Sequence, residues 1–595
     1  MTVSDYIIDY LAKCGVDTVF MVTGGQAMFL NDAVYRTKGI KPIFTHHEQA
    51  AGMAAEAYSR IGDKLGVAMV TAGPGAINVL NGVVGGYVDS APMMVISGQA
   101  AYSTVSYMEN NKIRQLGLQG IHIAPIARTV TKYFKTIDDP AMVKYYLDEA
   151  YFLATSGRKG PVWIEVPLDI QRMEVPKKFL EKFNPPKTTR IKYGLKKDVL
   201  GVVTLISKSK RPIFLLGQGV KIAKAQEVLN RLLLKLKIPT LTTRLAIDLI
   251  ESGNPLFVGR PGLYPDRASN FAIQNSDLII VVGARLDVGV VGYNPKDWGR
   301  NAKKIVVDLD KEELNKPGID IDLAINHDAK EFLTELLAQT KNKKSQDYSQ
   351  WISICANWRT KYPMVLPEYK KEKLVNSYYF SERLSALAKS NDTIVVDTSS
   401  PFHVVCQTWN VKSGQRFLTT GGISTMGYWP SAIGACLANG GGRTIVVTGD
   451  GCLQMNIQEL ATVRQNKLPI KIFVINNKGY LLIRHTQKIH MEGRMMGESE
   501  KTGLWFPNLE KIAKAYEIFY VHINNSGEVD KKIKQALLHT GPVLCDVKSP
   551  EWQLVIPRIS SSRQPDGSML TRPYEDLFPF LDPKELKENM ISERD

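Results

Sequence analysis

The sequence predicts an α/β protein of three doubly wound parallel-sheet domains, and three observations support this prediction. Short apolar runs of strand length alternate with amphipathic helical patterns, which is typical of βαβ units. The chain has 595 residues, too many for a single hydrophobic core. Two polar, lysine-rich stretches divide the alternation into three blocks. We therefore expect three separate sheets, each with its own helices.

The first block, assigned to residues 1–175, carries four predicted strands separated by glycine-rich turns and helical patterns. These strands are 18–22, 42–45, 66–71 and 93–97. The stretch 172–193 follows and contains three prolines and many lysines. Because proline lacks a backbone N–H and disfavours a helical predecessor, we interpret this stretch as a linker.

The second and third blocks repeat the same alternation. We assign residues 190–340 to a second domain, with predicted strands at 212–216, 277–282 and 304–309. The third domain is assigned to residues 370–550, with predicted strands at 393–397, 444–448, 470–475 and 543–547 and a helix at 456–464. The tail, residues 551–595, lacks periodicity, so we expect a loop-rich wrap that ends in a short helix near 583–590.

The composition excludes several classes of protein. No signal peptide is apparent, and no apolar run approaches the roughly 18 residues that a membrane helix needs. The six cysteines form no Cys-x-x-Cys pair, which argues against a disulfide framework or zinc site and fits the cytoplasm. The formal charge of +16 is spread without an aromatic-interleaved basic patch. We therefore expect a solvated surface that can attract anionic substrates, and no nucleic-acid partner.

The most informative motif lies at the ends of two predicted strands of the third domain. Gly449, Asp450 and Gly451 follow one strand, and Asn477 follows the next, 27 positions after Asp450. Ligands of open α/β sheets collect at the carboxyl ends of strands, so the two elements face one crevice. Mg²⁺ prefers a carboxylate, neutral oxygens and ligand phosphates. We predict a magnesium site made by Asp450, Asn477 and the Gly479 carbonyl, with a diphosphate near the glycines.

Further segments resemble the acetolactate synthase-like family of thiamine diphosphate-dependent enzymes over most of residues 1–550. The matching segments are FTHHEQAAGMAAEAYSR from Phe44, VTAGPGAIN from Val70, YVDSAPMMVISGQ ending at Gln99, RPIFLLGQG from Arg211, VGARLD from Val282, VVDLDKEEL from Val306 and GGISTMGYWPSAIGA from Gly421. The resemblance implies a pyrimidine-binding, a central and a diphosphate-binding domain. It also implies a homodimer or homotetramer, because two subunits contribute to each cofactor site.

The resemblance further implies the residues of the site. Glu48 matches the catalytic glutamate, which exchanges a proton with the cofactor, and Gln119 lies near the reacting centre. The cofactor-binding residues implied are Glu48, Pro74, Asn78, Thr398, Ser399, Ser400, Ser424, Met426, Gly449, Asp450, Gly451, Cys452, Asn477, Gly479 and Tyr480. Without the other motifs, Glu48 is better explained as a carboxylate at the start of the predicted helix 49–59, where the helix dipole favours negative charge; the other motifs favour the catalytic role.

Two departures from the family bear on the substrate. Acetolactate synthases carry an arginine and a tryptophan that recognise a second 2-oxo acid, and the matching positions here hold Gly289 and Thr486. Losing a carboxylate clamp weakens such an acceptor and opens space. We expect decarboxylation of a 2-oxo acid, pyruvate in the first instance, and transfer of the acyl unit to a larger carbonyl acceptor. The tail resembles enzymes that use keto-sugar nucleotides, whose phosphates Arg558, Arg563 and Arg572 would hold.

The central domain resembles the flavin-binding domain of acetolactate synthases. Five residues fall on matching positions, namely Gly217, Gly219, Arg285, Asp308 and Asp328, with Asp308 suited to a ribose hydroxyl. Pro261 replaces a histidine on the flavin side of that site. FAD, ADP and no nucleotide therefore stay open as alternatives for this domain.

Three other functions remain as alternatives. The first is acetolactate synthase itself, which Gly289 and Thr486 disfavour. The second is a simple 2-oxo acid decarboxylase that releases an aldehyde. The third is a silent regulatory subunit, against which the joint presence of Glu48, Asp450 and Asn477 argues.

Overall fold

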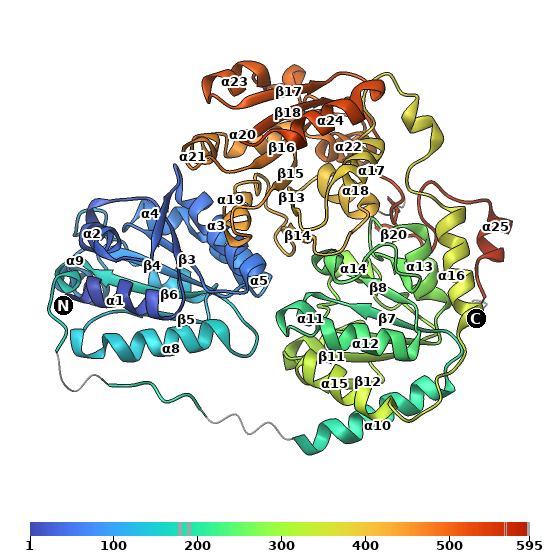
Figure 1. Ribbon diagram of the computed structural model, residues 1–595, viewed down its shortest axis with the longest axis horizontal. Coiled ribbons are helices and arrows are strands. Elements are labelled where there is room, and N and C mark those ends of the chain that lie inside the picture. Colours follow the sequence, from blue (N-terminus) through green and yellow to red (C-terminus); the bar gives the residue numbers. More distant parts are fainter. Residues whose placement is uncertain (177–180, 187–191, 564–565, 567, 592–595) are drawn as a thin grey trace.

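The computed structural model describes residues 1–176, 181–186, 192–563, 566 and 568–591. It contains three six-stranded sheets whose strands are all parallel, which confirms the predicted fold class. Figure 1 shows the three domains side by side, with the first in blue and cyan, the second in green and the third in orange. Among the described residues no helix is long and apolar enough to cross a membrane.

The first sheet has the strand order β2-β1-β3-β4-β6-β5. Its strands are β1 (Thr18–Met21), β2 (Lys41–Phe44), β3 (Gly66–Val70), β4 (Met93–Gln99), β5 (Tyr133–Thr136) and β6 (Val162–Pro167). Its main helices are α1 (Val3–Lys13), α2 (Met28–Arg36), α3 (Glu48–Gly62), α5 (Leu80–Val88) and α8 (Val143–Thr155). The four predicted strands are confirmed to within two residues, whereas β5 and β6 were not predicted.

The second sheet has the order β12-β11-β10-β7-β8-β9. Its strands are β7 (Pro212–Leu216), β8 (Thr240–Thr242), β9 (Phe257–Gly259), β10 (Leu278–Val282), β11 (Lys303–Asp308) and β12 (Leu323–Asn326). Helices α10 (Lys192–Lys208), α12 (Gln226–Leu236), α13 (Arg267–Asn275), α15 (Ala329–Thr340) and α16 (Ser349–Lys361) surround it. The three predicted strands are confirmed, and the three missed strands are only three or four residues long.

The third sheet has the order β14-β13-β15-β16-β18-β17. Its strands are β13 (Thr393–Val396), β14 (Arg416–Thr419), β15 (Thr444–Gly449), β16 (Ile470–Asn476), β17 (Phe519–Ile523) and β18 (Val543–Lys548). The predicted helix 456–464 was wrong in its start. Within 456–464 the helix is α21 (Glu459–Gln465), and the non-helical backbone of Asn456 separates it from a preceding helix, α20 (Asp450–Met455).

The first and third domains share one hydrophobic core. Helix α3 packs on α19 (Ser431–Ala438), and residues of both helices belong to the same buried cluster. The approach requires glycine, since a Cβ on Gly434 would lie 1.8 Å from the carbonyl oxygen of Ala54. Glu56 accepts a hydrogen bond from the Tyr428 hydroxyl and pairs with Arg60 at 2.6 Å. The two helices therefore form one rigid unit.

The linker and the tail lie outside the sheets. Within 172–193 the described residues form no helix or strand before α10, apart from one isolated bridge between Thr2 and Glu174. The tail carries a short hairpin, β19 (Ser561–Arg563) and β20 (Met569–Thr571), and ends in α25 (Pro583–Glu588), as predicted. Asn275 donates to the carbonyl oxygen of Asn589 at 3.0 Å, and Figure 1 shows the red tail beside α13 and α16. The tail thus clasps the central domain of its own chain.

Candidate functional site

Asp450 and Asn477 meet at the carboxyl ends of β15 and β16. The Asp450 carboxylate accepts hydrogen bonds from the backbone N–H groups of Gly451 at 2.7 Å and Gly479 at 3.1 Å. Burial raises the pKa of Asp450 to about 6. The amide oxygen of Asn477 is buried and has no hydrogen-bond partner, which is a costly arrangement in a folded protein. A divalent cation would satisfy both oxygens.

The donor set suits magnesium rather than a transition metal. Asp450 supplies one carboxylate and Asn477 a neutral oxygen, which are the oxygen ligands that Mg²⁺ prefers. Gly479 is held against Asp450 through its backbone N–H, and the role predicted for its carbonyl oxygen as a third ligand stays a prediction. Among the described residues no group of three or more His, Cys, Asp or Glu side chains gathers around a common point. The predicted magnesium residues therefore lie together and fit the ion.

Gly451 faces two predicted cofactor residues. A Cβ at this position would lie 2.1 Å from Cε1 of Tyr480 and 3.2 Å from the terminal methyl of Met426. A side chain larger than hydrogen would therefore force Tyr480 to move. The sulfur of the buried Cys452 lies 4.0 Å from the carbonyl oxygen of Thr398, so the loop after β13 joins the same group.

Asp397, which sequence reasoning treated only as a strand end, ties these loops together. Its carboxylate accepts hydrogen bonds from the backbone of Thr398 at 2.8 Å and Tyr428 at 3.0 Å, and from the Thr448 hydroxyl at 3.0 Å. Burial raises the pKa of Asp397 to about 6. The one available signal was an acidic residue directly after a buried apolar strand. The hydrogen-bond partners of Asp397 are remote in sequence, so the sequence did not predict a role for it.

Two of the predicted cofactor serines have strained backbones. Ser399 precedes α18 (Ser400–Thr408) with φ 70° and ψ −146°, and Ser424 has φ 45°. Positive φ costs a non-glycine residue about 1–3 kcal/mol and collects at functional sites. Both serines were predicted to contact the cofactor, and their loops adopt a backbone conformation that lowers the stability of the folded protein.

Glu48 and its predicted neighbours form a second group, on the first domain. Glu48 is the first residue of α3, and the Asn78 amide donates to its carboxylate at 2.9 Å. A Cβ on Gly75 would lie 3.3 Å from the other carboxylate oxygen. Gln119, with φ 59°, places its carbonyl oxygen against Gly73, the residue before Pro74. The structure therefore brings Glu48, Pro74, Asn78 and Gln119 into one neighbourhood.

The two groups are separate within one chain. In the part of the chain that the structure describes, no hydrogen bond or ion pair joins the Glu48 group to the Asp450 group. The nearest connection is structural, since the backbone N–H of His46 donates to Glu459 on α21 at 3.1 Å. The Glu48 group also lies beside large apolar side chains that are exposed, Ile77 at 48% and Leu118 at 79%.

Three stretches of the chain match, in order, the three parts of one enzyme family. Residues 1–124 match the thiamine pyrophosphate enzyme N-terminal TPP binding domain, 199–336 its central domain and 397–547 its C-terminal TPP binding domain. The chain belongs to the thiamine pyrophosphate enzymes. The predicted class, a thiamine diphosphate-dependent transferase or lyase, is thereby confirmed, and thiamine diphosphate is its cofactor.

Relatives cover this thiamine pyrophosphate enzyme almost end to end. It is 31% identical over 574 residues to the acetolactate synthase large subunit of Porphyra purpurea, covering 94% of this chain and 93% of the relative. It is 30% identical over 571 residues to the acetolactate synthase large subunit of Lactococcus lactis, with 95% of each chain covered. The isozyme 1 large subunit of Escherichia coli is 28% identical over 566 residues, covering 94% of this chain and 96% of the relative.

A cavity of about 890 Å³ lies where the three domains of the enzyme meet. Four of the five predicted flavin-site residues line it, namely Gly219, Arg285, Asp308 and Asp328, together with Pro261. Gly217 is not among the lining residues. It packs against the backbone instead, since a Cβ there would lie 2.0 Å from the Gly283 carbonyl oxygen. Burial raises the pKa of Asp308 to about 6.

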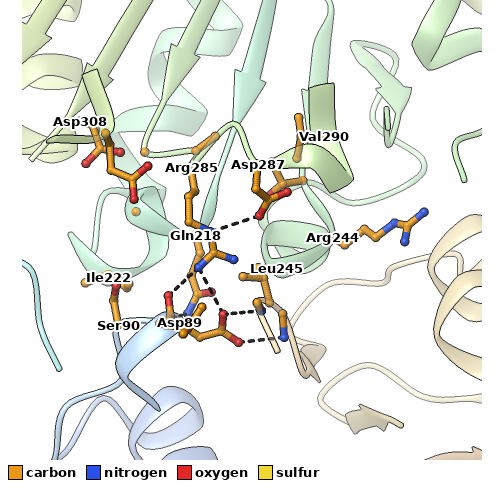
Figure 2. A pocket seen from close by; sticks show the side chains of 18 of the residues that line it. Asp89, Ser90, Gln218, Ile222, Arg244, Leu245, Arg285, Asp287, Val290 and Asp308 are labelled. Carbon is orange, nitrogen blue, oxygen red and sulfur yellow. Dashed lines mark hydrogen bonds and ion pairs between the residues drawn. The ribbon is translucent and has the colours of Figure 1, made fainter. Parts of the chain in front are cut away.

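Asp89 connects all three domains at one edge of this cavity. Its carboxylate accepts hydrogen bonds from the backbone of Gly421 at 2.8 Å and Gly422 at 3.0 Å. The guanidinium groups of Arg285 and Arg60 lie 3.6 and 3.5 Å away. Figure 2 shows Asp89 facing Arg285, which also reaches Asp287. Sequence reasoning missed Asp89, although it lies in a quoted motif.

The positions that depart from the family are placed differently. Gly289 lines the cavity, and its carbonyl oxygen accepts a hydrogen bond from the backbone N–H of Leu263 at 3.1 Å. Thr486 lies on α22 (Leu481–His490), is exposed, and donates its hydroxyl hydrogen to Leu482 of the same helix. Of the two positions, only Gly289 therefore borders the cavity.

Of the tail arginines, Arg558 and Arg572, whose side chains the structure describes, do not line the cavity. Arg572 pairs with Asp576 at 3.2 Å, and the Arg558 guanidinium lies 5.7 Å from the ring centre of Phe578. The side chain of Arg563 lies outside the described part of the chain. The expected phosphate contacts of the tail therefore stay a prediction.

Proposed function

We propose that this enzyme is a thiamine diphosphate- and Mg²⁺-dependent carboligase. It decarboxylates a 2-oxo acid, pyruvate in the first instance, and transfers the two-carbon acyl unit to a carbonyl acceptor such as a keto-sugar nucleotide. The observation that carries the proposal is the buried pair of Asp450 and Asn477, with an unsatisfied amide oxygen where a metal would bind. The bound cofactor supplies the carbanion chemistry that side chains lack.

The side chains have separate tasks in this reaction. Asp450, Asn477 and Gly479 hold the metal and, through it, the diphosphate. Glu48 exchanges a proton with the pyrimidine end, and the Asn78 amide at 2.9 Å orients its carboxylate. Gln119 borders the reacting centre. Met426, packed near Gly451 and Tyr480, supports the cofactor between the two ends.

The active unit is proposed to be a homodimer or a homotetramer. One cofactor must reach both a Glu48 group and an Asp450 group, and these are not joined within a chain. The exposed apolar side chains of Ile77 and Leu118 beside Glu48 provide a surface that a second copy can bury. A second chain therefore completes each site.

The residue at position 289 and the space at the domain junction support a large acceptor. The relatives are named acetolactate synthases, and a small second 2-oxo acid would need a cationic clamp that Gly289 does not supply. The cavity of about 890 Å³ is large enough for a nucleotide-sized molecule. We therefore favour a large acceptor over pyruvate.

The test is an incubation of the purified protein with thiamine diphosphate, Mg²⁺ and pyruvate, in which carbon dioxide release is followed with and without carbonyl acceptors. Release coupled to a keto-sugar nucleotide supports the proposal. Acetolactate formed from pyruvate alone would make the enzyme an ordinary synthase, and free acetaldehyde would make it a decarboxylase. FAD in the central domain is tested separately by the absorbance of the purified protein near 450 nm.

A further inference from the structure

Arg244 is an arginine without a carboxylate partner on the wall of the central cavity. It begins the 3-10 helix η3 (Arg244–Leu249) after β8 and lines the cavity. Its guanidinium donates to the Tyr264 carbonyl oxygen at 2.6 Å and to Nδ1 of His403 at 2.9 Å. Among the described residues no carboxylate forms an ion pair with it. Two of its five N–H donors are thus used, both by neutral acceptors.

The other arginines of the cavity wall are neutralised. Arg158 pairs with Asp310 at 2.6 Å and with Glu313 at 2.9 Å. Arg285 pairs with Asp287 at 3.1 Å. A sequestered cation without a counter-charge is costly, and burial accordingly lowers the pKa of Arg244. Arg244 therefore differs from the two other arginines of the cavity wall by lacking a carboxylate partner.

Aromatic side chains hold the Arg244 guanidinium in place. Its central carbon lies 4.9 Å from the ring centre of Phe402 and 6.0 Å from that of Tyr264. The His403 ring stacks on Tyr264 with centroids 3.9 Å apart. Because Nδ1 of His403 accepts from Arg244, its Nε2 carries the proton, and burial keeps the ring neutral by lowering the pKa of His403 well below its usual range. The side-chain groups left free are hydrogen-bond donors.

This donor cluster lies at the side of the cavity that borders the cofactor loops. Phe402 and His403 stand in the first turn of α18, which begins directly after the strained Ser399. Ser424, two residues before Met426, also lines the cavity. Figure 2 shows Arg244 extending away from the Asp89 and Arg285 junction, on the opposite side of the view from Asp308. Arg244 and Asp308 therefore lie at different ends of the cavity wall.

We propose that Arg244 binds the anionic group of a substrate, a carboxylate or a phosphate, and so selects anionic substrates for this enzyme. A planar guanidinium with free N–H groups matches the paired oxygens of either group. The assignment rests on the proposed function, because it places the anion beside the proposed cofactor loops. The carboxylate would belong to the 2-oxo acid and the phosphate to a nucleotide-linked acceptor.

Three variants test the site. Arg244→Met removes the charge and keeps the length, and Arg244→Lys keeps the charge without the planar fork. Arg359→Met is the matched control, because Arg359 likewise donates to two neutral acceptors, here two backbone carbonyl oxygens, lies over the Phe257 ring at 5.4 Å and does not line the cavity. Two readouts are used on the holoenzyme. They are the KM for pyruvate in decarboxylation with ferricyanide as acceptor, and the Kd of UDP measured by calorimetry.

We expect Arg244→Met to raise one of these constants at least tenfold with kcat within about twofold, Arg244→Lys to raise it less, and Arg359→Met to leave both constants unchanged. A change in the KM for pyruvate alone identifies the carboxylate, and a change in the Kd of UDP alone identifies the phosphate. If Arg244→Met does not fold, Arg244→Lys carries the test with a several-fold loss.

Equal values of the KM for pyruvate and of the Kd of UDP in wild type, Arg244→Lys and Arg244→Met would overturn the assignment. Arg244 would then have only a structural role. Failure of the proposed function has a different signature. A wild-type enzyme that releases no carbon dioxide from pyruvate refutes that function, whereas the binding of UDP and its dependence on Arg244 are measured without turnover. Absence of both pyruvate turnover and UDP binding would refute the two together.

Discussion

Replacing Asp89 by asparagine should weaken the junction at which the three domains meet. The carboxylate is 5% exposed, accepts two backbone hydrogen bonds from Gly421 and Gly422, and faces the guanidinium groups of Arg285 and Arg60. Asparagine keeps one acceptor oxygen but turns an NH₂ group toward the other backbone N–H. The loss of one charge-assisted hydrogen bond and the unpaired N–H together cost about 3 kcal/mol.

This cost should appear in cofactor affinity, because the loop that Asp89 anchors continues to Ser424 and Met426. About 3 kcal/mol corresponds to roughly a 100-fold weaker Kd for thiamine diphosphate with Mg²⁺. The assay is quenching of tryptophan fluorescence on titration with the cofactor. Asp287→Asn is the control, since the Asp287 carboxylate is 43% exposed and pairs with the same Arg285 at 3.1 Å. We expect the control to change affinity less than about fivefold. An Asp89→Asn variant that binds the cofactor like the control would refute the reasoning.

The remaining predictions concern single side chains of the two groups and the cavity. Glu48→Gln should lower kcat by about 10²–10⁴-fold without changing the melting temperature, and near-normal turnover would remove its catalytic role. Asn477→Leu should weaken Mg²⁺ binding, measured by calorimetry, while the metal-free protein gains up to about 1–3 kcal/mol, because the unsatisfied buried oxygen is gone. The raised pKa of Asp308, about 6, means that the folded protein binds a proton that the unfolded chain releases near pH 4. The stability that protonated Asp308 contributes is therefore fully present below about pH 4 and is lost as the pH rises through about 6. Asp308→Asn should consequently stabilise the protein by about 2–3 kcal/mol at pH 8 and hardly at pH 4, as measured by urea unfolding; equal effects at the two pH values would contradict this.

The sequence was sufficient to predict the fold wherever strands are long and buried. β7 has the predicted limits, and β15 and β16 differ from prediction by a single residue at one end. The strands that were missed include β8 and β9, with three residues each, too short to show a periodic pattern. They form strands because a neighbour already present in the sheet pairs with them, which is information from the tertiary structure.

In the candidate site, too, some residues could be predicted from the sequence and others could not. Asp450, Asn477 and Gly479 were predicted because their spacing places them at adjacent strand ends, and the structure brings them together. Asp397 and Asp89 were missed because each acts by accepting backbone hydrogen bonds from distant loops. Asp89 and Gly421 are 332 positions apart, and no local pattern reports such a pair. Arg244 was missed for the opposite reason, since its significance lies in the absence of a carboxylate nearby.

The separation of the Glu48 and Asp450 groups has a genetic consequence if the proposed homodimer is the active unit. Each chain then contributes its Glu48 group to one active site and its Asp450 group to the other. If one chain carries a Glu48 mutation and its partner an Asp450 mutation, both mutations fall in the same active site. The other active site of that mixed dimer contains the unmutated Glu48 and the unmutated Asp450. Two alleles that are each inactive alone would therefore complement one another when expressed together. A chain that carries both mutations would not be complemented by a chain that carries either one.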